Sequence, residues 1–140
     1  MSALETDLNP NTYIGLKLPI KNSSNLDFDM TKTSLEQSKF NITNLLLTNT
    51  GERVYQPEFG SRLRELIFEQ IDENLPNKIE EEVRRAVSRW LPYINIQDVQ
   101  TLSDDGNKNK VFVQVSFSTI LNSDTYQSIT LDAGFTTTTY

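Results

Sequence analysis

Hydrophobic positions change their period along the chain, from a helical spacing in the middle to an alternating spacing in the last third. From Thr33 to Leu47, apolar residues recur about every 3.6 residues, and Thr33 or Ser34 can cap the start. A shorter stretch from about Ser61 to Ile71 repeats this spacing. The pattern predicts two helices.

A third helix is predicted between Asn74 and Leu91. Its apolar stripe consists of Ile79, Val83, Ala86, Val87 and Trp90. Pro76 suits the first turn and Pro92 ends the helix. Three glutamates in the first half precede three arginines in the second, which matches the helix dipole. Pairs at i,i+4 are expected for Glu80 with Arg84 and for Glu81 with Arg85.

After Pro92 the period drops to two, which is typical of half-buried strands. The segment 94–102 begins this pattern, Val111–Ile120 gives the best strand, and Gln127–Ala133 offers a third. Polar turn residues separate the three segments. Helices followed by an antiparallel meander predict an α+β fold with about three helices and about three strands.

A chain of 140 residues is expected to form one domain. Residues 1–30 have little periodic pattern apart from an apolar island at 13–20. We interpret them as an extended N-terminal arm, with a disordered tail as the alternative. Residues 31–134 then form the α+β domain. The Thr-rich end, 135–140, is expected to be a flexible tail because it carries little core-forming surface.

The composition excludes several functions. The chain has no His and no Cys, so disulfides, thiolate chemistry, imidazole metal sites and His-dependent triads are excluded. A net charge of −6 argues against a nucleic-acid partner. No apolar stretch is long enough to span a membrane, and the N-terminus has no signal-peptide pattern. We expect no cofactor and no metal.

Carboxylates are the one plausible source of catalysis. Glu58 and Glu69 flank the second helix, and two carboxylates can hydrolyse a glycosidic bond. With 19 acidic residues some such pair is inevitable, so a solvated surface is the simpler interpretation. The segment Asp104–Asn107 lacks the ligand spacing of a calcium loop and is interpreted as a hairpin turn.

The segment from Gly51 to Gly60 is unusual because it combines Arg, Pro and two aromatic residues between glycines. Gly51 is suited to the left-handed conformation that ends many helices. Arg and aromatic residues are enriched at interface hot spots. The alternative is that Tyr55 and Phe59 fill the gap between two helices, and both interpretations can hold for different side chains of the loop.

The run Thr48-Asn49-Thr50-Gly51-Glu52-Arg53-Val54-Tyr55-Gln56-Pro57-Glu58-Phe59-Gly60 resembles the gene-product-W-like (gene-product-25-like) baseplate wedge family. That family occurs in contractile phage tails, type VI secretion and related injection systems, and the resemblance covers most of the chain. Members usually end the long helix with an aromatic residue and Glu-Pro-Arg, a docking motif. Here Trp90-Leu91-Pro92-Tyr93 stands instead, so any docking by this corner must use apolar and aromatic contacts.

The resemblance implies a structural, non-enzymatic wedge subunit of a virion tail baseplate, assembled in the host cytoplasm. It implies docking on a core bundle of other wedge proteins, contact with tail sheath subunits whose assembly the chain initiates through its sheet edges, and possible contact with tube or hub proteins. The expected partner-interface residues are Arg53, Tyr55, Pro57, Glu58, Phe59, Trp90, Pro92 and Tyr93. The strands expected to contact the sheath are those that carry Val113, Val115, Phe117, Ile129 and Leu131. The alternative function is a lysozyme-like, carboxylate-dependent cell-wall hydrolase.

Overall fold

The computed structural model describes residues 3–17, 30–68, 72–104, 107–132 and 137–138. In these ranges the helices are α1 (Ala3–Leu8), α2 (Ser34–Leu47), α3 (Leu63–Phe68) and α4 (Leu75–Trp90). The strands are β1 (Gly15–Leu16), β2 (Met30–Thr31), β3 (Ile94–Asp104), β4 (Asn107–Thr119), β5 (Gln127–Asp132) and β6 (Thr137–Thr138).

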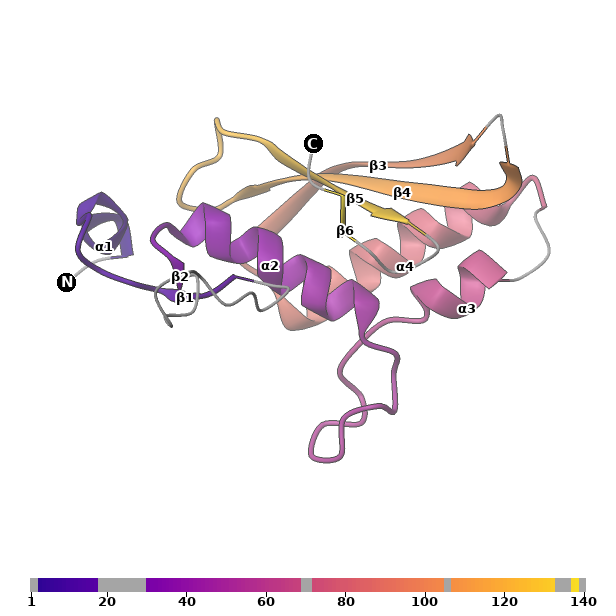
Figure 1. Cartoon of the computed structure of the whole chain (residues 1–140), viewed down its shortest axis with the longest axis horizontal. Coiled ribbons are helices and arrows are strands. Elements are labelled where there is room, and N and C mark those ends of the chain that lie inside the picture. Colours follow the sequence, from indigo (N-terminus) through magenta and orange to yellow (C-terminus); the bar gives the residue numbers. More distant parts are fainter. Residues whose placement is uncertain (1–2, 18–29, 69–71, 105–106, 133–136, 139–140) are drawn as a thin grey trace.

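The C-terminal strands form an antiparallel sheet in the order β3-β4-β5-β6. Helices α2, α3 and α4 lie together on one side of this sheet (Figure 1). Helix α4 packs against β3, and α2 packs against β5. The predicted α+β fold is confirmed, with β6 as an additional short strand beyond the three expected.

The core lies between this sheet and the helices. Four of the five residues predicted to form the stripe of α4 are almost fully buried, and Trp90 at its end is partly buried. From α2, Ile42, Leu45 and Leu46 enter the same core. Burying a side chain of this kind stabilises a fold by about 1.5–3 kcal/mol. The helical period of the sequence therefore identified the faces that hold the domain together.

The side chains that mark the strands expected to contact the sheath belong to this core. Val113, Val115 and Phe117 are 0% exposed, and Ile129 and Leu131 are at most 3% exposed. Alternation in a strand marks the face that is buried, and in this sheet that face is covered by the chain's own helices. Strand β4 is also paired on both sides, so it has no free edge. Contact with another chain through this sheet must use edge backbone or the outer face.

The N-terminal region differs from a simple extended arm because it begins with helix α1. Asn9 and Pro10 follow the helix directly, and both residues favour its end. Asp7 accepts hydrogen bonds from the backbone N–H and the hydroxyl of Ser34, at 2.8 and 2.7 Å. The region is thereby held to the first turn of α2. The turn expected at 22–25 lies outside the described residues.

Candidate partner interface

The loop between α2 and α3 projects away from the body of the molecule (Figure 1). Its second end is fixed at Gly60, which has a φ of +124°. A Cβ atom there would lie 2.4 Å from the carbonyl oxygen of Thr48. Ser61 donates from its backbone N–H to that same oxygen at 2.9 Å and from its hydroxyl to the carbonyl of Leu46 at 3.0 Å. The two ends of the loop are therefore joined.

Gly51 has a different role from the one predicted. Helix α2 ends at Leu47 with Thr48 as an extended cap, so Gly51 lies beyond the helix end. Its φ of +97° allows its N–H to donate to the carbonyl of Pro57 at 2.7 Å. This bond closes the loop across its width, and only a residue tolerant of positive φ permits it without strain.

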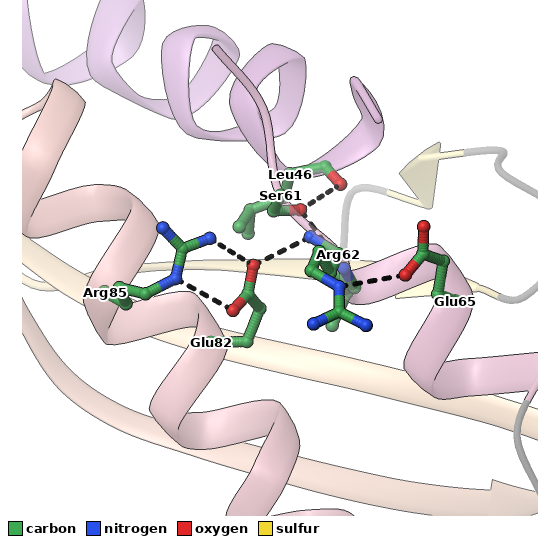
Figure 2. A network of polar contacts seen from close by, with 7 residues as sticks. Leu46, Ser61, Arg62, Glu65, Glu82 and Arg85 are labelled. Atoms are coloured by element: carbon green, nitrogen blue, oxygen red, sulfur yellow. Dashed lines mark hydrogen bonds and ion pairs between the residues drawn. The ribbon is translucent and has the colours of Figure 1, made fainter. Parts of the chain in front are cut away.

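A polar network anchors the start of α3 to α4 (Figure 2). The backbone N–H of Arg62 donates to Glu82 Oε1 at 2.7 Å, and Arg85 donates to the same carboxylate at 2.6 Å. Arg85 thus pairs with Glu82 and not with the predicted Glu81, whereas the predicted pair of Glu80 and Arg84 is present at 2.9 Å. The side chain of Arg62 is itself paired with Glu65.

The pKa of Glu82 is lowered by this network. Burial alone would raise the pKa of the carboxyl, because desolvation disfavours its charged form. The hydrogen bonds from Arg85 and from the Arg62 backbone, together with the charges of both arginines, outweigh that effect. The carboxylate that fixes the loop is therefore ionised at neutral pH.

Aromatic and charged side chains gather where the loop meets the end of α4. We call Arg53, Glu58, Phe59, Arg89 and Trp90 the Phe59–Trp90 cluster. The two rings meet edge to face, with centroids 5.2 Å apart and an interplanar angle of 67°. The Arg53 guanidinium carbon lies 3.9 Å from the Phe59 centroid, and that of Arg89 lies 5.3 Å from the Trp90 centroid. Arg89 is also ion-paired with Glu58.

Four of the predicted interface residues are thereby brought together: Arg53, Glu58, Phe59 and Trp90. Phe59 packs against the core, as the alternative interpretation expected, whereas Tyr55 does not fill a gap. Tyr55 is 97% exposed at the outer end of the loop, and Val54 beside it is 89% exposed. The loop therefore combines a fixed base with an apolar tip that faces solvent.

Pro92 and Tyr93 lie apart from this cluster. Pro92 is exposed, and the Tyr93 hydroxyl accepts a hydrogen bond from Asn41 of α2 at 2.9 Å. Tyr93 lines a groove of about 260 Å³ together with residues of the N-terminal region, α2 and the end of β4, including Ile14 and Ile120. The corner after α4 thus presents the aromatic side chain of Tyr93, whose position is fixed by the hydrogen bond from Asn41.

The carboxylate pair considered for catalysis finds no support in this geometry. Glu58 is an exposed residue held by Arg89, and Glu69 lies outside the described residues. The predicted turn after Asp104 falls between β3 and β4, as expected for a hairpin, and its residues 105 and 106 are also outside the described residues. In the described part of the chain, no three acidic residues are grouped so that they could hold a metal ion.

Sequence reasoning missed Arg89, Glu82 and Asn41. Arg89 lies next to Trp90 in the sequence, but its partner Glu58 is 31 positions earlier, and no local spacing predicts such a pair.

Among the described residues, no helix is both long enough and apolar enough to cross a membrane.

Comparison with known proteins decides the family. The model of the family described as baseplate wedge protein gp25 matches residues 34–124, which is more than half of the chain. The chain belongs to this family. It is therefore a structural protein of a contractile-tail baseplate, as the resemblance implied. The baseplate wedge protein gp25 of Enterobacteria phage T4 is 28% identical over 99 residues, which cover 69% of this chain and 73% of that protein.

Solved structures share the fold. A chain of the pyocin R2 baseplate in its postcontracted state has a TM-score of 0.56 and 26% identity, and the match covers 71% of this chain and 95% of that one. A chain of the anti-feeding prophage baseplate has a TM-score of 0.66 and 21% identity, covering 78% and 86%. A protein from Geobacter sulfurreducens described as a candidate tail lysozyme has a TM-score of 0.56 and 24% identity. The match covers 65% of this chain and 81% of that one. At these identities the last two show the fold alone.

Proposed function

We propose that this chain is a non-enzymatic wedge subunit that docks on other wedge proteins and initiates the tail sheath. The observation that carries the docking part is the Phe59–Trp90 cluster beneath the exposed Val54 and Tyr55. Aromatic and Arg side chains dominate the energy of many interfaces, and a pre-formed loop loses little entropy on binding. Pro92 and Tyr93 offer a second contact, apart from this cluster. The proposed partners are the helical core of the wedge, the sheath, and tube or hub proteins.

Sheath initiation is supported by the form of the sheet. The face opposite the helices and the outer strands are where another chain can reach it, since β4 is paired on both sides. An extended segment that adds to a sheet edge gains main-chain hydrogen bonds, and this mode depends little on its side chains. Such a contact suits a template that must start an ordered polymer.

Tails assembled with and without the chain test this function by electron microscopy. We expect tubes without sheath when the chain is missing and full-length sheaths when it is restored. Sheaths of normal length in its absence would overturn the initiating role. Release of cell-wall fragments by the purified chain, abolished by the double variant Glu58→Gln/Glu69→Gln, would overturn the non-enzymatic role.

A further inference from the structure

The outer edge of β5 is occupied by the chain's own C-terminal end. Strand β6 lies beside β5 (Figure 1). The two strands pair antiparallel, Thr130 with Thr138 and Leu131 with Thr137. The end that was expected to be a flexible tail therefore contains a strand. This position is the one that a strand from another chain would take on joining the sheet at β5.

The two sides of β5 are held very differently. Toward the interior of the sheet, all six residues of β5 are paired with β4. Toward the outside, β6 pairs with two of them, and the described residues provide no partner on that side for Gln127–Ile129. Strand β5 is further fixed by α2 and by its buried Ile129 and Leu131. Removing β6 would thus leave the rest of the sheet in place.

The sequence of this edge contains few devices against strand addition. Between Gln127 and Tyr140 there is no proline, and Asp132 is the one charged residue. Exposed edges are usually protected by charge, proline, bulges or a covering segment. Of these, the structure shows the covering segment, because β6 lies where the edge would otherwise be open.

We propose that the outer edge of β5 is a strand-acceptor site that β6 occupies in the free chain, and that an extended segment of a sheath subunit displaces β6 by strand exchange. This inference rests on the proposed sheath-initiating function and adds a mechanism that regulates when the edge is open. A strand held by two residue pairs is replaced readily by a longer one that also pairs with Gln127–Ile129. While β6 occupies this edge, the free protein cannot pair through it before docking.

A reversible lock tests the exchange. Thr130 and Thr138 are cross-strand partners, and partners in antiparallel strands lie within the Cα distance that a disulfide spans, about 4.4–6.8 Å. The chain has no other cysteine, so the double variant Thr130→Cys/Thr138→Cys can form one disulfide. Thr130 lies between the buried Ile129 and Leu131 and is itself only partly buried, so the lock spares the core.

The probe is the purified sheath subunit of the same tail, and its capture by the whole chain is measured in co-sedimentation. We expect the oxidised double variant to capture at least tenfold less sheath subunit than the same protein after reduction. A chain truncated after Gly134, which lacks β6, should capture at least as much as the full chain. Hydrogen exchange should show faster exchange of β5 amides in the truncated chain.

The outcomes separate the exchange from the proposed function. Equal capture by the oxidised and reduced forms would overturn the exchange and leave sheath docking intact. Capture by none of the proteins, the full chain included, would overturn the proposed function and the exchange with it. A concentration-dependent dimer of the truncated chain, with no gain in sheath capture, would show that the edge accepts a second copy and would also overturn the proposal.

Discussion

The loop between α2 and α3 and the edge of the C-terminal sheet offer partners different chemistry. The loop presents side chains: Tyr55 lies in solvent above a base fixed by Gly60 and Ser61. The sheet uses most of its apolar side chains in its own core, so its edge offers mainly backbone groups. Side-chain contacts give specificity for one partner, whereas backbone pairing suits a repeating polymer. The two regions therefore fit the proposed role of a subunit that stands between the wedge and the sheath.

The largest expected effect concerns the residue that joins the loop to the core. Trp90→Ala removes the ring that packs on Phe59 and closes the stripe of α4, so the free energy of unfolding should fall by about 3 kcal/mol. Trp90→Phe should cost much less, because it keeps a ring and removes a buried indole N–H that has no hydrogen-bond partner among the described residues. Urea denaturation measures both. An unchanged stability for Trp90→Ala would assign the ring wholly to the interface.

A smaller, pH-dependent effect is expected for the network that anchors α3. Because the pKa of Glu82 is lowered by folding, its contribution is present above the ordinary value of 4.5 and is lost as the pH falls through the folded-state pKa. Glu82→Gln should therefore lower the free energy of unfolding by about 1–2 kcal/mol at pH 7. Denaturation at a series of pH values should show this difference shrinking below pH 4.5. A difference that grows on acidification would contradict the assignment.

Arg53→Lys should leave the fold nearly untouched. Arg53 is exposed, and a cation–π contact at an exposed site contributes about 0.5–1 kcal/mol, part of which Lys retains. The planar guanidinium of Arg53 stacks on Phe59 and still has N–H groups that can donate to a partner. Lys lacks this group. We expect incorporation into baseplates to fall roughly tenfold, which corresponds to about 1.4 kcal/mol of binding. Normal incorporation would show that Arg53 is a solvent-facing charge with no docking role.

Local periodicity predicted the parts of the fold that local forces decide. The stripe of α4 and the alternation of β4 follow from side-chain direction along a helix and a strand, and both were found as expected. The same alternation could not show that the apolar face of β4 would be covered by the chain's own helices. Helix α1 has too few residues for a periodic pattern, and β6 forms because β5 lies beside it.

The sequence could indicate which segment forms the candidate site, but it could not predict the contacts within that site. The combination of Arg, Pro and aromatic residues between two glycines indicated the loop, and the structure brings Arg53, Glu58 and Phe59 to Trp90. The contact of Glu58 with Arg89 depends on how α4 crosses the loop, which no spacing in the sequence encodes. The docking role of these residues remains a prediction.

Tyr55→Ala tests the central claim most directly, because the claim separates docking from folding. Tyr55 is 97% exposed, so its removal should change the free energy of unfolding by no more than about 0.5 kcal/mol. Tyr126→Ala is the matched control, since Tyr126 is also exposed, at 62%, and lies outside the loop. With both variants supplied to tails that lack the chain, we expect baseplate incorporation to fall at least tenfold for Tyr55→Ala and to stay normal for Tyr126→Ala. Normal incorporation of Tyr55→Ala would contradict the docking role of the loop.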